Sequence, residues 1–290
     1  MSHFQFQTVS NIISGLGSIY ELKQLLQQQP YKKLLLVTDA GMIQQQLHLP
    51  IIEILETIQL DYVIYSSVQA DPPEHIVLDA VQFAKNEKAD IVLGFGGGSS
   101  LDVAKIIAIL AHPQQQQTLQ NLYGINNAKQ PRLLLFLVPT TAGTGSEVTP
   151  ISIVTTGETT KTGIVSPVLF ADVAILDATF TQNLPAHITA ATGIDAMVHA
   201  IEAYTSKIKK NPYADMLAKQ ALKLLNQNLS LVLADSQNLA ARQNMLVGSM
   251  LAGQAFANAP VGAVHALAYP LGGHFHISHG HSNAFVLHQH

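Results

Sequence analysis

The sequence predicts an α/β N-terminal domain with a parallel sheet, followed by an all-α C-terminal domain. Two observations lead to this prediction. In the first half, short runs rich in Leu, Val and Ile alternate with amphipathic stretches, a pattern typical of βαβ units on a parallel sheet. After Pro185 the strand signals nearly vanish and the chain becomes rich in Ala and Leu, which favours helices. We therefore expect two domains, residues 1–180 and 181–290.

The individual elements follow from the same patterns. Short apolar runs predict buried strands at 33–38, 62–65, 91–95, 133–138 and 173–177. Apolar residues at three- and four-residue spacing predict helices at 41–60, 73–87 and 100–111, and the Ala- and Leu-rich composition predicts helices at 216–233 and 239–256. The Thr-, Gly- and Ser-rich segment between Pro139 and Gly163 is assigned no strand or helix.

The composition excludes several classes of protein. With 290 residues, of which 48% are hydrophobic, the chain can bury a sizeable core. The formal net charge of −4 offers no basic surface for nucleic acid, and no apolar run is long enough to span a membrane. There are no cysteines, so any metal must bind nitrogen and oxygen ligands. The first residues lack the pattern of a secretory signal, and we expect a cytoplasmic protein.

A glycine-rich turn follows the strand expected at 91–95. Gly97, Gly98 and Ser99 directly precede a predicted helix, whose first turn offers free backbone N–H groups and the positive end of the helix dipole. These three residues form a candidate pyrophosphate site. The alternative is a tight strand-to-helix turn that uses glycine for packing alone. The turn is not a Walker A loop, because no Gly-Lys-Ser/Thr follows it.

Asp39 follows the strand expected at 33–38, at the edge where α/β sheets bind ligands. A carboxylate there can accept a hydrogen bond from a ribose 2′-hydroxyl and would repel a 2′-phosphate, which favours NAD over NADP. The alternative is that Asp39 caps the next helix or stabilises a turn.

A hydroxyl-rich loop follows the strand expected at 133–138. Its residues Thr140, Thr141 and Thr144 would suit a phosphate, a ribose or a nicotinamide amide, and the alternative is a plain Thr-rich turn. Lys161, further along, is a candidate charge partner for cofactor oxygens, although a lone lysine is usually solvated.

Histidines are concentrated at the end of the chain, where seven of the 13 lie in the last 26 residues. Asp195 and His199 are four residues apart, so they share one helix face and could hold a divalent ion or hydrogen-bond to each other. His265 lies in an apolar segment, where a buried imidazole needs a partner, and His279 follows a glycine turn. One Asp and three His suit Fe(II) or Zn(II) better than calcium or magnesium.

Together these segments resemble the iron-containing (group III) alcohol dehydrogenase family. The similarity runs from about residue 4 to residue 286 and includes four motifs in order, at 96–105, 139–149, 193–202 and 262–280. The resemblance implies NAD contacts at Asp39, Gly97, Gly98, Ser99, Thr140, Thr141, Thr144 and Lys161, with Asp71 a weaker candidate. It implies that Asp195, His199, His265 and His279 bind Fe2+ or Zn2+.

The resemblance also implies a function. A member of this family transfers a hydride between NAD and a primary or secondary alcohol, giving an aldehyde or ketone, in a cleft between two domains, and it forms a homodimer. An alternative is a dehydroquinate-synthase-like lyase, which would need basic residues near the metal motifs. Many family members have a histidine where this chain has Tyr269, and members of the family continue with further helices. An incomplete, inactive remnant that binds NAD or metal is therefore a third hypothesis.

Overall fold

The computed structural model describes residues 3–28, 30–157, 160–260, 282 and 286. The chain divides into two compact units. The sheet unit comprises Val9–Thr140 and Pro150–Asp177, and the helical unit comprises Met1–Thr8, Thr141–Thr149 and Ala178–His290. The parallel α/β fold and the helical C-terminal part are confirmed. The domain limits 1–180 and 181–290 remain a prediction.

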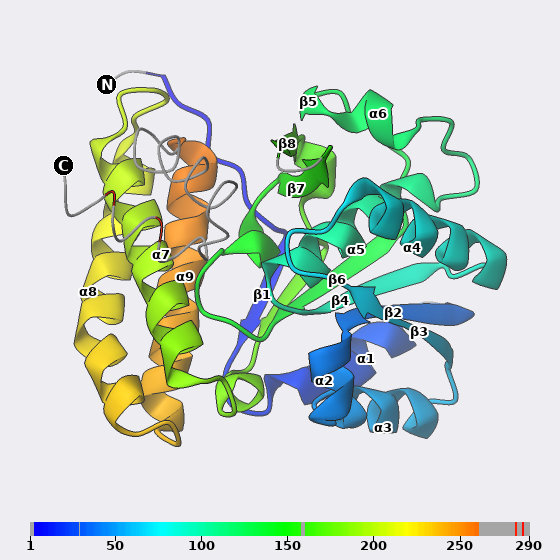
Figure 1. Ribbon diagram of the computed structural model, residues 1–290, viewed down its shortest axis with the longest axis horizontal. Helices are drawn as coiled ribbons and strands as arrows, with labels where there is room; N and C mark the ends of the chain where they lie inside the picture. Colours follow the sequence, from blue (N-terminus) through cyan, green and yellow to red (C-terminus); the bar gives the residue numbers. More distant parts are fainter. Residues whose placement is uncertain (1–2, 29, 158–159, 261–281, 283–285, 287–290) are drawn as a thin grey trace. The chain divides into compact units, whose positions relative to one another are not determined.

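A six-stranded parallel sheet forms the centre of the sheet unit (Figure 1). Its strand order is β1-β9-β6-β4-β2-β3. The strands are β1 (Asn11–Ser14), β2 (Lys33–Asp39), β3 (Asp61–Val68), β4 (Ile91–Gly96), β6 (Leu134–Pro139) and β9 (Val173–Leu176). All of β4 and the interior of β2 are buried, which explains why both are nearly continuous apolar runs. Every strand expected from the sequence is found, and β1 adds an edge that was not expected.

Helices cover both faces of this sheet. In Figure 1, α4 (Glu74–Glu87) and α5 (Gly98–Leu110) lie on one side of the strands, with α2 (Ala40–Gln44) and α3 (Leu49–Thr57) on the other. Two shorter helices are α1 (Leu22–Gln27) and α6 (Leu119–Leu122). The single helix expected at 41–60 is wrong: Gln46 has a φ of +57°, a left-handed conformation that an α-helix does not continue through.

A second, smaller sheet lies in the segment for which the sequence pattern predicts no element. β7 (Ile151–Thr156) and β8 (Thr160–Val165) pair antiparallel, and β5 (Gly124–Ile125) joins β8 in parallel. An isolated bridge between Pro73 and Thr155 links this hairpin to the start of α4. Threonine is a β-branched residue that fits strands well, so a Thr-rich composition did not require a loop here.

Three long helices form most of the helical unit: α7 (Ala186–Thr205), α8 (Pro212–Ala234) and α9 (Leu239–Asn258). They pack closely because glycines lie at their contacts. A β-carbon on Gly193 of α7 would lie 2.7 Å from Cδ1 of Leu229, and one on Gly248 of α9 would lie 2.8 Å from Cγ of Leu225. Within the described part of the chain, every helix is too short or too polar to cross a lipid bilayer.

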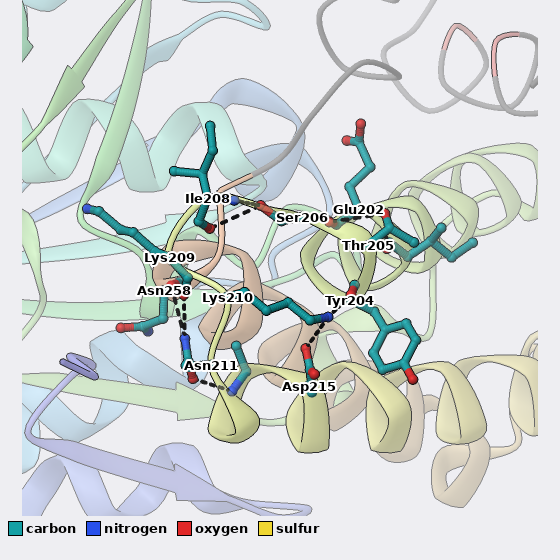
Figure 2. A network of polar contacts seen from close by, with 12 residues as sticks. Glu202, Tyr204, Thr205, Ser206, Ile208, Lys209, Lys210, Asn211, Asp215 and Asn258 are labelled. Carbon is teal, nitrogen blue, oxygen red and sulfur yellow. Dashed lines mark hydrogen bonds and ion pairs between the residues drawn. The ribbon is translucent and has the colours of Figure 1, made fainter. Parts of the chain in front are cut away.

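A polar network fixes the connection between α7 and α8 (Figure 2). The Asn211 side chain caps α8, and its amide nitrogen donates hydrogen bonds to the backbone oxygens of Lys209 and Asn258, at 3.0 and 3.2 Å. Nζ of Lys210 forms an ion pair with Asp215 at 2.8 Å. The start of α8 is thereby joined to the end of α9.

Candidate functional site

The glycine-rich turn between β4 and α5 lines a cleft of about 420 Å³. The cleft lies at the carboxyl ends of β2, β3 and β4, and its wall consists of Asp39, Ala40, Gly41, Val68, Gln69, Ala70, Gly97, Gly98, Ser99 and Ser100. Gly97 is the N-cap of α5 and Gly98 its first residue. The first N–H groups of a helix have no partner within the helix, so this end of α5 can bind an anion.

Two neighbouring glycines are required by close contacts. A β-carbon on Gly94 would lie 2.7 Å from Cβ of Ala104, so α5 rests directly on β4. Gly96 has a φ of +146°, and a β-carbon there would lie 2.7 Å from Oγ of Ser100. The packing role proposed as the alternative therefore applies to Gly94 and Gly96, whereas Gly97 and Gly98 line the cleft.

Asp39 caps α2 through one of its two carboxylate oxygens. Its Oδ1 accepts hydrogen bonds from the backbone N–H groups of Gly41 and Met42, at 2.9 and 3.2 Å, and so caps α2. Its Oδ2 lies 3.3 Å from the position of a β-carbon on Gly96. Capping occupies Oδ1, which leaves Oδ2 as the oxygen that a ribose hydroxyl would contact.

Lys161 of β8 is paired in the structure. Its Nζ lies 2.6 Å from Oδ1 of Asp71, whose backbone has a φ of +51°. The backbone N–H of Asp71 donates to Oγ of Ser99 at 3.2 Å, and the hydroxyl of Thr155 donates to the backbone oxygen of Asp71 at 2.9 Å. Asp71 therefore joins Lys161 to the start of α5, beside the cleft.

A buried ion pair that sequence reasoning missed anchors α5 to β7. Lys105 is fully buried, with its Nζ 3.5 Å from Oδ1 of Asp102, and it donates to the backbone oxygen of Ile151 at 2.6 Å. Oδ2 of Asp102 accepts from the backbone N–H of Ile153 at 2.9 Å. The signal in the sequence is two opposite charges three residues apart in an otherwise apolar helix.

The three threonines of the hydroxyl-rich loop fall into different units. Thr140 belongs to the sheet unit and donates its backbone N–H to Gly96 at 2.9 Å. Its hydroxyl is buried and has no hydrogen-bond partner among the described residues, which is the condition expected of a group that a ligand would satisfy. Thr141 and Thr144 belong to the helical unit, where Oγ1 of Thr144 accepts from the backbone N–H of Ser146 at 3.2 Å.

Asp195 and His199 lie together on the buried face of α7. Their side chains are 5% and 8% exposed, and Nδ1 of His199 is 4.0 Å from Oδ2 of Asp195. The imidazole stacks on the ring of Phe256 of α9, with centroids 4.4 Å apart. A carboxylate oxygen and an imidazole nitrogen held this close fit two ligands of one divalent ion.

The other two expected ligands, His265 and His279, lie outside the described residues. The part of the chain that the structure describes contains no group of three or more metal-binding side chains. Two of the four expected ligands, Asp195 and His199, are thus among the described residues.

Known protein families match most of the chain. The family model for iron-containing alcohol dehydrogenase matches residues 10–178, and the model for the C-terminal part of the Fe-containing alcohol dehydrogenase family matches residues 189–290. The chain is 43% identical over 274 residues to long-chain-alcohol dehydrogenase 1 of Geobacillus thermodenitrificans. That alignment covers 94% of this chain and 69% of the relative.

Solved structures give the same result. The crystal structure of a 1,3-propanediol oxidoreductase superposes with a TM-score of 0.94 at 37% identity, covering 99% of this chain and 74% of that one. A sulfoacetaldehyde reductase from Bifidobacterium kashiwanohense, solved in complex with NAD+, gives a TM-score of 0.91 at 28% identity and covers 99% and 76%.

These relatives are named as enzymes that oxidise alcohols or reduce aldehydes, which fits hydride transfer better than the lyase alternative. Two family models together match most of the chain, and its fold is similar to that of the solved structures. The chain therefore belongs to the iron-containing alcohol dehydrogenase family, and its activity is that of an alcohol dehydrogenase.

Proposed function

We propose that this chain interconverts a primary or secondary alcohol and its aldehyde or ketone, with NAD as the hydride carrier and Fe2+ or Zn2+ bound in the helical unit. The observation that carries the proposal is the buried pair Asp195 and His199, in a chain that also offers an anion-binding cleft at the start of α5. The pair suits a divalent ion, and the cleft suits the pyrophosphate of a dinucleotide.

The residues of the sheet unit bind the cofactor in this proposal. The backbone N–H groups at Gly97, Gly98 and Ser99 contact the pyrophosphate, and Oδ2 of Asp39 accepts a hydrogen bond from a ribose hydroxyl. The remaining contacts come from Thr140, Thr141, Thr144 and Lys161. Lys161 already has a carboxylate partner, so Asp71 holds its ammonium group beside the cleft before the cofactor arrives.

Asp195, His199, His265 and His279 bind the metal in this proposal. A bound divalent ion supplies Lewis acidity to the substrate oxygen. Burial of Asp195 and His199 excludes water from their side, and the stacked ring of Phe256 fixes the plane of the imidazole.

We assign the NAD-binding domain to residues 1–180 and the metal-binding domain to residues 181–290. We further propose that the enzyme acts as a homodimer in the cytoplasm on a small alcohol or aldehyde, as the family resemblance implies.

The metal assignment is tested by His199→Ala, with His187→Ala as the matched control. Both residues lie on α7, but His187 is exposed at its start and His199 is buried. Loss of a ligand should remove at least ~90% of the bound metal, since outer-shell changes alone cost about 10–100-fold in affinity. Elemental analysis of the purified proteins measures this. Equal metal content in the two variants would refute the assignment.

The cofactor assignment is tested by calorimetric titration of the metal-loaded chain with NAD+ and NADP+, followed by assay with a panel of short alcohols. Binding to the native state raises the melting temperature, so thermal shift separates a ligand-binding protein from one that binds nothing. Binding of NAD+ without turnover of any alcohol would favour the inactive remnant over the dehydrogenase.

A further inference from the structure

The loop Thr141–Thr149 touches α9 through bare backbone. Gly145 has a φ of +60°, and a β-carbon there would lie 2.7 Å from Cα of Gly253 and 3.1 Å from the backbone oxygen of Ser249. Conversely, a β-carbon on Gly253 would lie 2.9 Å from Cα and from the backbone oxygen of Gly145. Two glycines therefore face each other where the loop meets the helix, and neither position has room for a side chain.

The same loop touches α7 in the same way. A β-carbon on Gly143 would lie 2.7 Å from Cβ of Thr192 and 3.1 Å from its Cα. The hydroxyl of Thr192 donates to the backbone oxygen of Ile188, at 2.9 Å, so it is turned toward its own helix. The loop thus meets α9 at its backbone and α7 at Cα and Cβ of Thr192, atoms that a change of rotamer cannot move away.

These contacts lie one helical turn from the candidate metal ligands. Thr192 precedes Asp195 by three residues on α7, and Gly253 precedes Phe256 by three residues on α9. Residues three apart on a helix lie on the same face. Phe256 in turn stacks on His199. The two contacts thus lie one turn from Asp195 and one turn from the ring that stacks on His199.

We propose that Gly143, Gly145 and Gly253 are positioning residues, whose bare backbones set the position of Thr141 and Thr144 relative to Asp195 and His199. This inference rests on the proposed function, in which those threonines contact NAD and the other two residues bind the metal. The loop and the metal-binding helices then move as one body, because rigid contacts of this kind cannot adjust by a change of rotamer.

Within the loop, the position of Thr144 depends on the same contacts. Gly145 begins the 3-10 turn Ser146–Val148, and the N–H of Ser146 donates to Oγ1 of Thr144. Val148, at the end of this turn, also packs against α9, with its Cγ2 2.9 Å from the position of a β-carbon on Gly253. An added methyl group at Gly253 must therefore displace the turn that orients the Thr144 hydroxyl.

The first test compares Gly253→Ala with Gly248→Ala. Both are Gly-to-Ala changes in the interior of α9, and both create contacts under 3.0 Å, but Gly248 faces Leu225 of α8 and not the loop. For Gly253→Ala we expect unchanged metal content and a fall in kcat of about 100-fold, the loss expected for a displacement of about 1 Å near the reacting groups. For Gly248→Ala we expect kcat and the Kd for NAD+ to stay within about twofold of the parent protein, with a shift in melting temperature only.

The second test compares Gly145→Ala with Gly157→Ala. Both glycines have positive φ, at +60° and +65°, so alanine strains the backbone equally at each. Among the described residues, no atom beyond its chain neighbours lies within 4 Å of the β-carbon position of Gly157, whereas Gly145 has the backbone of α9. We expect Gly145→Ala to repeat the kinetic defect of Gly253→Ala and Gly157→Ala to show none.

Hydrogen exchange of residues 141–149 gives a readout that does not depend on NAD, metal or turnover. We expect exchange in this loop to rise about tenfold in Gly253→Ala and to stay unchanged in Gly248→Ala. Unchanged exchange in Gly253→Ala, or equal effects of both α9 variants on exchange and kcat, would overturn the positioning role. If the parent chain neither binds NAD+ nor turns over alcohol, the proposed function fails, and the exchange measurement still decides whether the glycine contacts fix the loop.

Discussion

Charges and side-chain hydrogen bonds hold the candidate cofactor residues of the sheet unit, whereas glycine contacts hold the candidate site residues of the helical unit. In the sheet unit, Asp39 caps α2, Asp71 joins Lys161 to Ser99, and Lys105 ties α5 to β7. In the helical unit, α7 and the loop Thr141–Thr149 reach their neighbours through Gly193, Gly143 and Gly145.

This difference predicts which kind of substitution breaks each kind of contact. A buried polar anchor, such as Lys105 with Asp102, is broken when one partner loses its charge or its donor, because the other is left buried and unsatisfied. A glycine contact with backbone, such as that of Gly145, is broken by added volume, because backbone has no alternative rotamer, whereas at Gly193 the ends of Leu229 and Met245 must shift. Changes of charge at constant size should therefore disrupt the polar anchors of the sheet unit. A single methyl group should disrupt the glycine contacts, which include Gly94 and Gly96 of the sheet unit as well as those of the helical unit.

The largest effect is expected from Lys105→Met, which keeps the length of the side chain and removes its charge. The fully buried ammonium group pairs with Asp102, and breaking a buried pair costs about 3–5 kcal/mol. Urea unfolding measures the loss. Lys33→Met is the control, because its pair with Glu87 is about one-third exposed and should contribute at most about 1 kcal/mol. Similar losses in both variants would contradict polar anchoring of α5.

Gly193→Ala tests the helical unit by adding volume without changing charge. The new methyl group would lie 2.7 Å from Leu229 and 2.9 Å from Met245. Overpacking costs about 1–3 kcal/mol, partly offset by about 0.5–1 kcal/mol from the better helix propensity of alanine. We expect a net loss of about 1 kcal/mol in urea unfolding. Gly163→Ala, whose nearest atom lies 3.6 Å away, should change stability by less than about 0.5 kcal/mol, and a larger loss there would remove the contrast.

Asp39→Asn tests whether the charge of Asp39 in the sheet unit also determines the preference for NAD over NADP. The amide oxygen of asparagine can still cap α2, so the change removes charge and leaves the local fold. We expect the ratio of kcat/KM for NADP to that for NAD to rise about tenfold, or about 1.4 kcal/mol. Asp61→Asn is the matched control and should leave this ratio unchanged, because Asp61 lies at the start of β3, whereas Asp39 lies at the end of β2 where the cleft is. An unchanged ratio in Asp39→Asn would exclude charge repulsion as the basis of selectivity.

The smallest effect concerns Tyr123, whose hydroxyl donates to Oε1 of Glu74 at 2.7 Å. Burial first, and then the Glu74 carboxylate, raise the pKa of Tyr123 above its ordinary value near 10. The unfolded chain therefore ionises first, so stability is unaffected below about pH 10 and falls as the pH rises further. Tyr123→Phe should reduce this fall, measured as the urea midpoint at about pH 8 and pH 11. Tyr20→Phe, at an exposed position, should not change it.

Much of the fold follows from local sequence. The buried runs of β2 and β4 are apolar on both faces, and between helices such short runs indicate the strands of a parallel sheet. The β7–β8 hairpin was missed because a Thr-rich composition suits both loops and strands, and only the pairing partner decides between them. The break between α2 and α3 depends on the backbone at Gln46, a residue type with no preference for a left-handed conformation.

In the candidate site, too, contacts between residues far apart in the chain could not be predicted from local sequence. The sequence alone predicts that one cleft is lined by Asp39, Gly97, Gly98 and Ser99, because parallel strands all end at one edge of the sheet. The contact between Gly145 and Gly253 could not, because it joins residues far apart in the chain and leaves no mark beyond two small residues. The partner of Lys161 was equally hidden, since its ion pair with the distant Asp71 depends on the hairpin that the sequence did not reveal.

The complete burial of Lys105 also makes this side chain a natural reporter of conformational opening. Other lysines, such as Lys23 and Lys85, are exposed and would react at once with an amine-specific reagent. Nζ of Lys105 can react only when α5 separates from β7. The rate of labelling at this one amine, followed by mass spectrometry, would therefore measure how fast the sheet unit opens, without any substitution in the chain.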